Sequence, residues 1–155
     1  MKGIKTRIIA IDYGQKRIGI AYSDETKLIA MPKEMILTER KLERTALKFA
    51  ELIRAHEKEL GYQVEEIVIG KPLLMSGKSG LMADEVKAFV ELLSKEFTCP
   101  IIAWDERLSS VQAERALIEA NLSRKQRTKH VDQVAAVIIL QSYLDHKHIA
   151  KERQT

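Results

Sequence analysis

The sequence is poor in cysteine and aromatic residues and has no long apolar run. Cys99 is the single cysteine among 155 residues, so a disulfide framework and a cysteine-based zinc site are both excluded, and a cytoplasmic setting is expected. Aromatic residues make up 5% of the chain, which argues against recognition of nucleic acid through several stacked bases. No apolar stretch reaches the roughly 18 residues that would span a bilayer, so no membrane association is expected.

The remaining composition is that of a globular protein, with 45% hydrophobic and 31% charged residues. At 155 residues the chain is long enough to bury a hydrophobic core without disulfides or structural metals. We therefore expect a single domain over residues 1–155. The net charge of +4 favours polyanionic partners such as nucleic acid.

Apolar patterning predicts an α/β fold with a mixed sheet. β-Branched residues predict a hairpin over 6–12 and 17–23, and a less regular third strand over 27–37 with Pro32 at an edge or a bulge. Strands that are separated by helices pair in parallel, so a mixed sheet is expected. The other expected elements are a helix from Thr38 as N-cap to Gly61, a strand over 64–70, a helix with an apolar stripe over 82–97, a strand over 101–105, a helix from Ser109 to about Asn121, a basic loop over 122–130 and a last helix from near Val131.

The segment VIGKPLLMSGKSG, residues 68–80, contains the Gly-Lys-Ser tripeptide of a nucleotide-binding phosphate loop. Such a loop requires a glycine five positions before Gly77, and that position is Pro72, which also lacks a backbone N–H. The segment therefore predicts a surface turn before a helix. Looser phosphate contacts through Lys71, Lys78 or nearby backbone amides stay open.

Acidic residues follow two predicted strands and begin a predicted helix. Asp12 ends the first strand, Asp105 and Glu106 end the fifth, and Asp132 lies at the start of the last helix. Each has an ordinary explanation alone, as a turn former, a helix-entry residue or a partner of the helix dipole. If the elements are neighbours, however, the carboxylates converge, and a divalent cation is needed to offset their repulsion.

Oxygen ligands of this kind suit Mg²⁺ or Mn²⁺. Two such ions, roughly 3.5 to 4 Å apart, activate water and stabilise the leaving oxygen in phosphodiester hydrolysis. Ala135 and Ala136 follow Asp132 by one helical turn, and such small residues let a helix approach a sheet closely. The chemistry indicated is that of a nuclease.

Basic residues flank all three acidic positions, as a polyanionic substrate held beside carboxylates requires. Each of them alone is typical of a solvated surface charge. The candidate substrate-binding residues are Lys16 and Arg17 after Asp12, Lys71 at the fourth strand, Arg107 after Glu106, and Arg124, Lys125, Arg127 and Lys129 before Asp132.

Four segments together resemble the signature motifs of the YqgF family of bacterial proteins. They are IDYGQKRIGIAYSD, IVIGKPLLMSGKSG, WDERLSS and VDQVAAVIILQSYL, and they cover nearly the whole chain in the family's order and spacing. Members are described as nucleases of pre-16S ribosomal RNA or as Holliday junction resolvases. The resemblance implies a ribonuclease H-like fold with five strands flanked by helices, and an acidic divalent-metal site.

Carried over position by position, the family's acidic residues match Asp12, Asp105, Glu106 and Asp132. We expect Asp12, Glu106 and Asp132 to be the metal ligands, with Asp105 as the rival of Glu106, because neighbours on a strand point to opposite sides. The chain departs from the family at Gly70-Lys71-Pro72, usually Gly-Leu-Pro, and at Met75-Ser76-Gly77, usually Met-Asp-Gly. These departures concern substrate contacts in that loop and leave the carboxylates unchanged.

The expected function is metal-dependent cleavage of structured RNA, in maturation of the 5′ end of 16S ribosomal RNA, by a monomer or weak homodimer. An alternative is resolution of four-way DNA junctions, which needs a dimer for paired cuts. A second is a non-catalytic nucleic-acid-binding factor in transcription or ribosome assembly. A third is an actin-like ATPase, because Asp12-Tyr13-Gly14 matches its first strand turn, but such enzymes use two domains where one is expected here.

Overall fold

The computed structural model describes the backbone of residues 3–71, 77–105 and 124–153, and the side chains of 3–70, 82–105 and 134–153. Within these ranges one mixed sheet has the strand order β3-β2-β1-β4-β5. The pairs β1–β2 and β2–β3 are antiparallel, whereas β1–β4 and β4–β5 are parallel, as predicted. The elements are β1 (Thr6–Tyr13), β2 (Arg17–Ser23), β3 (Ala30–Leu37), α1 (Leu42–Leu60), β4 (Gln63–Lys71), α2 (Gly77–Glu96), β5 (Ile101–Asp105) and α4 (Arg124–Arg153).

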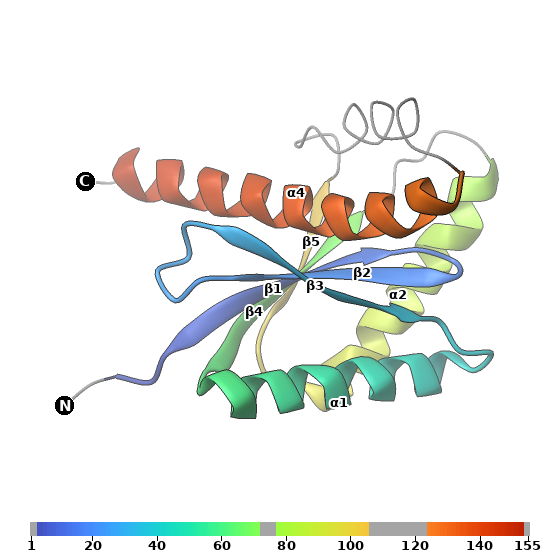
Figure 1. The fold of residues 1–155 in the computed structure, drawn as a ribbon, viewed down its shortest axis with the longest axis horizontal. Helices are drawn as coiled ribbons and strands as arrows, with labels where there is room; N and C mark the ends of the chain where they lie inside the picture. The colour runs from blue at the N-terminus through green and yellow to red at the C-terminus, as the bar shows by residue number, and fades with distance from the viewer. Residues whose placement is uncertain (1–2, 72–76, 106–123, 154–155) are drawn as a thin grey trace.

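Helices cover both faces of the sheet (Figure 1). Helices α1 and α2 pack on one face, and α4 crosses the other. Because β1, β4 and β5 are parallel, their carboxyl ends lie along one end of the sheet, which we call the carboxyl end. The β1–β2 turn and the beginnings of α1 and α4 lie at this end as well, and the opposite end is called the amino end.

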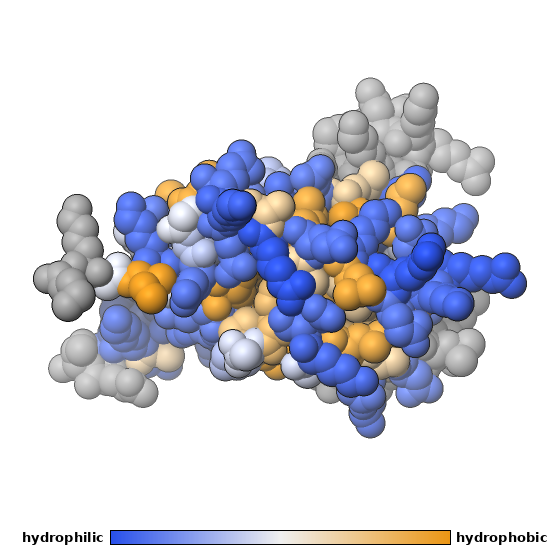
Figure 2. Space-filling model, turned by 90° about the horizontal axis from the view of Figure 1, so that it is seen from below, coloured by the Kyte–Doolittle hydropathy of each residue, from blue (hydrophilic) through white to orange (hydrophobic). Residues whose placement is uncertain are grey.

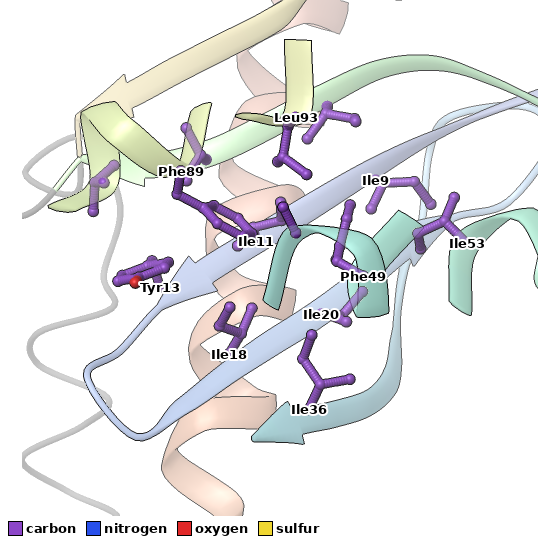
Figure 3. Close-up of a cluster of buried hydrophobic side chains, with 14 of the residues drawn as sticks. Ile9, Ile11, Tyr13, Ile18, Ile20, Ile36, Phe49, Ile53, Phe89 and Leu93 are labelled. Carbon is purple, nitrogen blue, oxygen red and sulfur yellow. The ribbon is translucent and has the colours of Figure 1, made fainter. Parts of the chain in front are cut away.

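The core on the α1–α2 face follows from strand alternation, which sends every second residue of β1 to the same side. Ile9 and Ile11 meet Phe49 of α1 and Phe89 of α2, and all four side chains are fully buried (Figure 3). The rings of Phe49 and Phe89 lie edge to face with centroids 6.3 Å apart. Burial of each such side chain contributes about 1.5 to 3 kcal/mol, so this cluster anchors both helices to the sheet.

The core on the α4 face combines small residues with large ones such as Trp104 and Tyr143. Ile8, Ala10 and Val68 of the sheet pack against α4, where Ala135 and Ala136 are buried. Alanine side chains let the helix backbone approach the strands closely, as expected from the sequence. The face that carries the even-numbered residues of β1 is therefore tightly covered by one helix.

The start of α1 differs from its prediction. Its N-cap is Lys41, without a side-chain capping hydrogen bond, and the hydroxyl of Thr38 instead donates to the backbone carbonyl of Gln15 at 2.7 Å. The helix does end at Gly61 as predicted, in the left-handed conformation (φ 70°) that glycine adopts without strain. The third strand begins at Ala30, later than predicted, and Pro32 lies on the edge strand β3.

Two predicted loops are helical instead. Helix α4 begins at Arg124, seven residues before the expected start near Val131, so most of the predicted basic loop forms its first two turns. The tripeptide Gly77-Lys78-Ser79 opens α2 and does not lie in a turn. The helix predicted from Ser109 to Asn121 lies outside the described residues.

Candidate active site

Asp12 is a buried carboxylate near the carboxyl end of the central strand. It pairs with Gly19 of β2 in the antiparallel ladder, and its residue is 4% exposed. Strand alternation places it on the α4 face with Ile8 and Ala10. The β1–β2 turn is closed by the Gly14 N–H, which donates to the Arg17 carbonyl at 2.9 Å.

Glycines occupy the two positions beside Asp12 on the neighbouring strands. Gly19 is its direct partner on β2, and the parallel pairing of Ile11 with Ile69 places Gly70 next to it on β4. Both glycines are buried. Asp12 consequently stands between two strand positions that carry no side chain, on the face that α4 crosses.

Asp105 lies on the other face of the sheet. It ends β5, where it pairs with Lys71 at the end of β4. Ile102 and Trp104 of β5 pack on the α4 face, whereas Ile101 packs on the α1–α2 face, so alternation assigns Asp105 to the latter. Its rival Glu106, and Arg107 beyond it, lie outside the described residues.

Asp132 lies in the interior of α4. The helix begins at Arg124, so Asp132 is more than two turns from its N-terminus, and the first turn contains no acidic residue. The helix dipole acts within the first turn, so the dipole explanation suggested by the sequence is wrong. Ala135 and Ala136, one turn later, are buried against the sheet. The backbone of Asp132 thus belongs to the helix that covers the face bearing Asp12.

The candidate basic residues are distributed around the carboxyl end. Lys16 is exposed in the β1–β2 turn, and Arg17 is half-buried at the start of β2 with no hydrogen-bond partner for Nε among the described residues. Lys71 ends β4. The first two turns of α4 contain Arg124, Lys125, Arg127 and Lys129.

The described side chains include no group of three or more histidine, cysteine, aspartate or glutamate residues that could hold a metal ion. Of the predicted ligands, the structure describes the side chain of Asp12 and the backbone of Asp132. Asp12 supplies a hard oxygen donor, which fits Mg²⁺ or Mn²⁺ and does not suit a soft metal.

Among the described residues, none of the helices combines the length and the apolar character that a membrane span requires.

Two features near the site were not predicted from the sequence. The Tyr13 hydroxyl is hydrogen-bonded to Glu85 of α2, and burial followed by the charge of Glu85 raises the pKa of Tyr13. A second group of basic residues, Arg40, Lys41 and Arg44, begins α1 at the carboxyl end. The basic group could have been found in the sequence, because the dipeptide Arg40-Lys41 directly precedes a predicted helix. The contact between Tyr13 and Glu85 could not, because it depends on tertiary packing.

The fold is that of the RuvC-type nucleases. The chain matches the structure of T. thermophilus RuvC in complex with a Holliday junction substrate with a TM-score of 0.58 at 10% identity, covering 92% of this chain and 96% of that one. It matches the fowlpox virus Holliday junction resolvase with a TM-score of 0.54 at 14% identity, covering 90% and 99%. At these identities the likeness establishes the fold alone.

The sequence comparisons establish the family. A family model described as "RuvX: Holliday junction resolvase" matches residues 6–146. A relative from Protochlamydia amoebophila is 54% identical over 142 residues, which cover 92% of this chain and 95% of the relative, and one from Halothermothrix orenii is 42% identical, covering 92% and 96%. Both are named "Putative pre-16S rRNA nuclease". The chain belongs to the RuvX family and is a nuclease, and the resemblance read from its four motifs is confirmed.

Proposed function

We propose that the protein is a divalent-metal-dependent nuclease of structured RNA whose active site lies at the carboxyl end of the sheet, on the α4 face. The observation that carries this proposal is the position of Asp12. Its carboxylate is 4% exposed, near the carboxyl end of the central strand, on the face crossed by the helix that contains Asp132, and it offers the hard oxygen donor that Mg²⁺ or Mn²⁺ prefers.

The proposed metal ligands are Asp12, Glu106 and Asp132. Asp12 and the helix carrying Asp132 share one face of the sheet, whereas alternation assigns Asp105 to the opposite face. We therefore propose Glu106 in place of Asp105 as the third ligand. A bound Mg²⁺ or Mn²⁺ would supply Lewis acidity and lower the pKa of a bound water.

The other residues at this end are proposed to hold the substrate. Lys16, Arg17 and Lys71 lie at the ends of strands adjoining Asp12, and the first turns of α4 add four more basic residues. Positive charge there attracts a polyanion that the carboxylates alone would repel. Phosphate contacts of this kind fix the position of the backbone without reading its sequence.

The proposed substrate is the 16S ribosomal RNA precursor, a choice that the names of the similar relatives support, and the proposed cleavage is at its 5′ end. The test is to incubate purified protein with such a precursor and with a four-way DNA junction, each in Mg²⁺ and in Mn²⁺. We expect cleavage of the precursor, reduced by about 10³-fold in Asp12→Asn because the several kcal/mol supplied by the metal are lost.

The matched control is Asp84→Asn, which removes an exposed carboxylate of α2 and should cleave like the wild type. Cleavage that survives Asp12→Asn would refute the site. The family description favours a second candidate, resolution of DNA junctions. Paired cuts in the junction by a dimer, with the RNA precursor left intact, would establish that activity in place of the first.

A further inference from the structure

Exposed basic side chains also lie at the carboxyl end around the β1–β2 turn and the start of α1. They belong to Lys16 in the β1–β2 turn and to Arg40, Lys41 and Arg44 at the start of α1, and we call this group the α1 basic surface. Seen from the α1 side, strongly hydrophilic side chains project from the end where α1 begins (Figure 2).

None of the four basic side chains of this surface makes an ion pair with a carboxylate in the part of the chain that the structure describes. Some basic residues elsewhere are paired: Lys27 lies 3.5 Å from Glu65, and Arg54 lies 2.9 Å from Glu96. Others, such as Lys58 and Lys95, make no ion pair among the described residues but lie singly at the amino end and are not clustered. Residues 14–17 and 38–48 together contain six basic residues and only two acidic ones, Glu39 and Glu43. The α1 basic surface therefore carries positive charge that the described residues do not neutralise.

The position of this charge is unfavourable for the helix itself. A helix N-terminus carries the positive end of the helix dipole, so basic residues there oppose helix formation. The N-cap of α1 is Lys41, and it makes no side-chain hydrogen bond to the helix, so the usual capping stabilisation is also missing. Glu43 offsets this arrangement in part. Basic residues that disfavour their own helix are better explained by an anionic partner than by stability.

The α1 basic surface is held in a fixed position relative to the candidate active site. The Thr38 backbone N–H donates to the Lys16 carbonyl at 3.0 Å, and the Thr38 hydroxyl donates to the Gln15 carbonyl at 2.7 Å. The Glu39 N–H donates to the Thr45 hydroxyl at 2.8 Å. The segment before α1 is thus tied to the same hairpin turn that follows the strand of Asp12.

We propose that the α1 basic surface binds the phosphate backbone of the nucleic-acid substrate at a distance from the cleaved bond. Asp12 lies on the α4 face and the α1 basic surface on the other side of the hairpin, so a substrate that contacts both passes over the hairpin turn. This inference rests on the proposed nuclease function, and it assigns a second contact region to the same substrate. The recognition is of phosphates, because the surface offers lysine and arginine side chains without aromatic ones.

The test compares two triple variants of equal net charge. The first, Arg40→Gln/Lys41→Gln/Arg44→Gln, removes charge from the α1 basic surface. The control, Lys58→Gln/Lys95→Gln/Lys151→Gln, removes three exposed lysines at or near the ends of α1, α2 and α4 at the amino end. Binding of a structured RNA and of a four-way DNA junction is measured in Ca²⁺ as a function of salt, and urea unfolding verifies that both variants are folded.

We expect the surface variant to bind nucleic acid at least about tenfold more weakly than the wild type. On duplex, the slope of log affinity against log salt concentration should fall by about 0.9 for each lost phosphate contact. The control variant should stay close to the wild type in both measurements. In cleavage assays the surface variant should raise KM and leave kcat unchanged. Equal losses of binding in the two variants would overturn the inference, as would unchanged binding in the surface variant. If no protein cleaves either substrate but the difference in binding persists, the inference stands and the proposed function fails.

Discussion

Two buried carboxylates lie on the face of the sheet that α4 covers, one toward each end, and their surroundings differ. Glu66, 7% exposed, accepts a hydrogen bond from the Tyr143 hydroxyl at 2.5 Å and pairs with Lys147, both from α4. Asp12, 4% exposed, has Gly19 and Gly70 beside it on the neighbouring strands. The two residues are similarly buried, but Glu66 is held by side chains of α4 at the amino end, whereas Asp12 lies near the carboxyl end, where the basic residues Lys16 and Arg17 follow it in the chain.

The comparison distinguishes Glu66, which stabilises the packing of α4 on the sheet, from Asp12, for which we propose a catalytic role. At Glu66 the cost of burying an acid is offset within the chain, by a hydroxyl donor and an ammonium group. Near the same end, His56 contacts Tyr62 and Arg7 contacts Glu25, although Nε of Arg7 has no hydrogen-bond partner among the described residues. We infer that the amino end contributes chiefly to stability and the carboxyl end chiefly to function.

The largest expected effect on stability is that of Glu66→Ala. The substitution leaves the buried Tyr143 hydroxyl without its acceptor and Lys147 without its partner, so the free energy of unfolding should fall by about 2 to 3 kcal/mol. Urea unfolding measures this change. Cleavage per folded molecule should be unchanged, the reverse of the result expected for Asp12→Asn. Loss of activity in a fully folded Glu66→Ala protein would break the comparison.

A smaller effect is expected of Gly14→Ala in the hairpin turn. A Cβ at this position would lie 2.6 Å from the Arg17 carbonyl oxygen, so the turn backbone has to shift, at a cost of about 1 to 3 kcal/mol. Because the turn carries Lys16 and follows Asp12, cleavage should fall as well. The control is Gly3→Ala, where a Cβ meets no atom within 4 Å. Equal thermal stability of the two variants would contradict the tight turn described here.

The smallest expected effect is a dependence of the free energy of unfolding on pH, which is caused by His56 near the amino end. Burial, followed by the charge of Lys33, lowers the pKa of His56, whose Nδ1 lies 2.7 Å from the Tyr62 hydroxyl. The unfolded chain therefore binds the proton more readily, and stability is complete above about pH 6.5 and declines below it, by at most about 1.4 kcal/mol per pH unit.

Unfolding in urea at several pH values measures this slope. His56→Gln should remove the contribution of His56, whereas His148→Gln, at an exposed position of α4, should retain it. An identical slope in the wild type and in His56→Gln would show that His56 does not contribute to it.

Most of the fold was predictable because its signals are local. Alternating β-branched residues indicated β1 and β2, and Gly61 marked the end of α1. The start of α1 was predicted wrongly because Thr38 uses its hydroxyl to bind the hairpin turn. The start of α4 was predicted too late because charge suggested a loop, although arginine, lysine and glutamine are strong helix formers.

The candidate site was predictable only in part. The acidic positions stood out in the sequence, and the sheet assigns Asp105 to the face opposite that of Asp12, whereas the choice between Asp105 and Glu106 stays a prediction. The strand register that puts Gly19 and Gly70 beside Asp12 depends on pairing between distant segments, which one sequence does not show. Nor did the sequence indicate that Tyr143, 77 residues away, offsets the buried charge of Glu66.

The most direct test of the central claim is a crystal structure of the protein soaked in Mn²⁺, with the metal located by its anomalous scattering. The account predicts manganese on the α4 face at the carboxyl end, bound by Asp12, Asp132 and Glu106. Asp12→Asn should abolish this binding, whereas Asp84→Asn should leave it intact. Manganese bound by Asp105 on the opposite face, or unchanged in Asp12→Asn, would contradict the account.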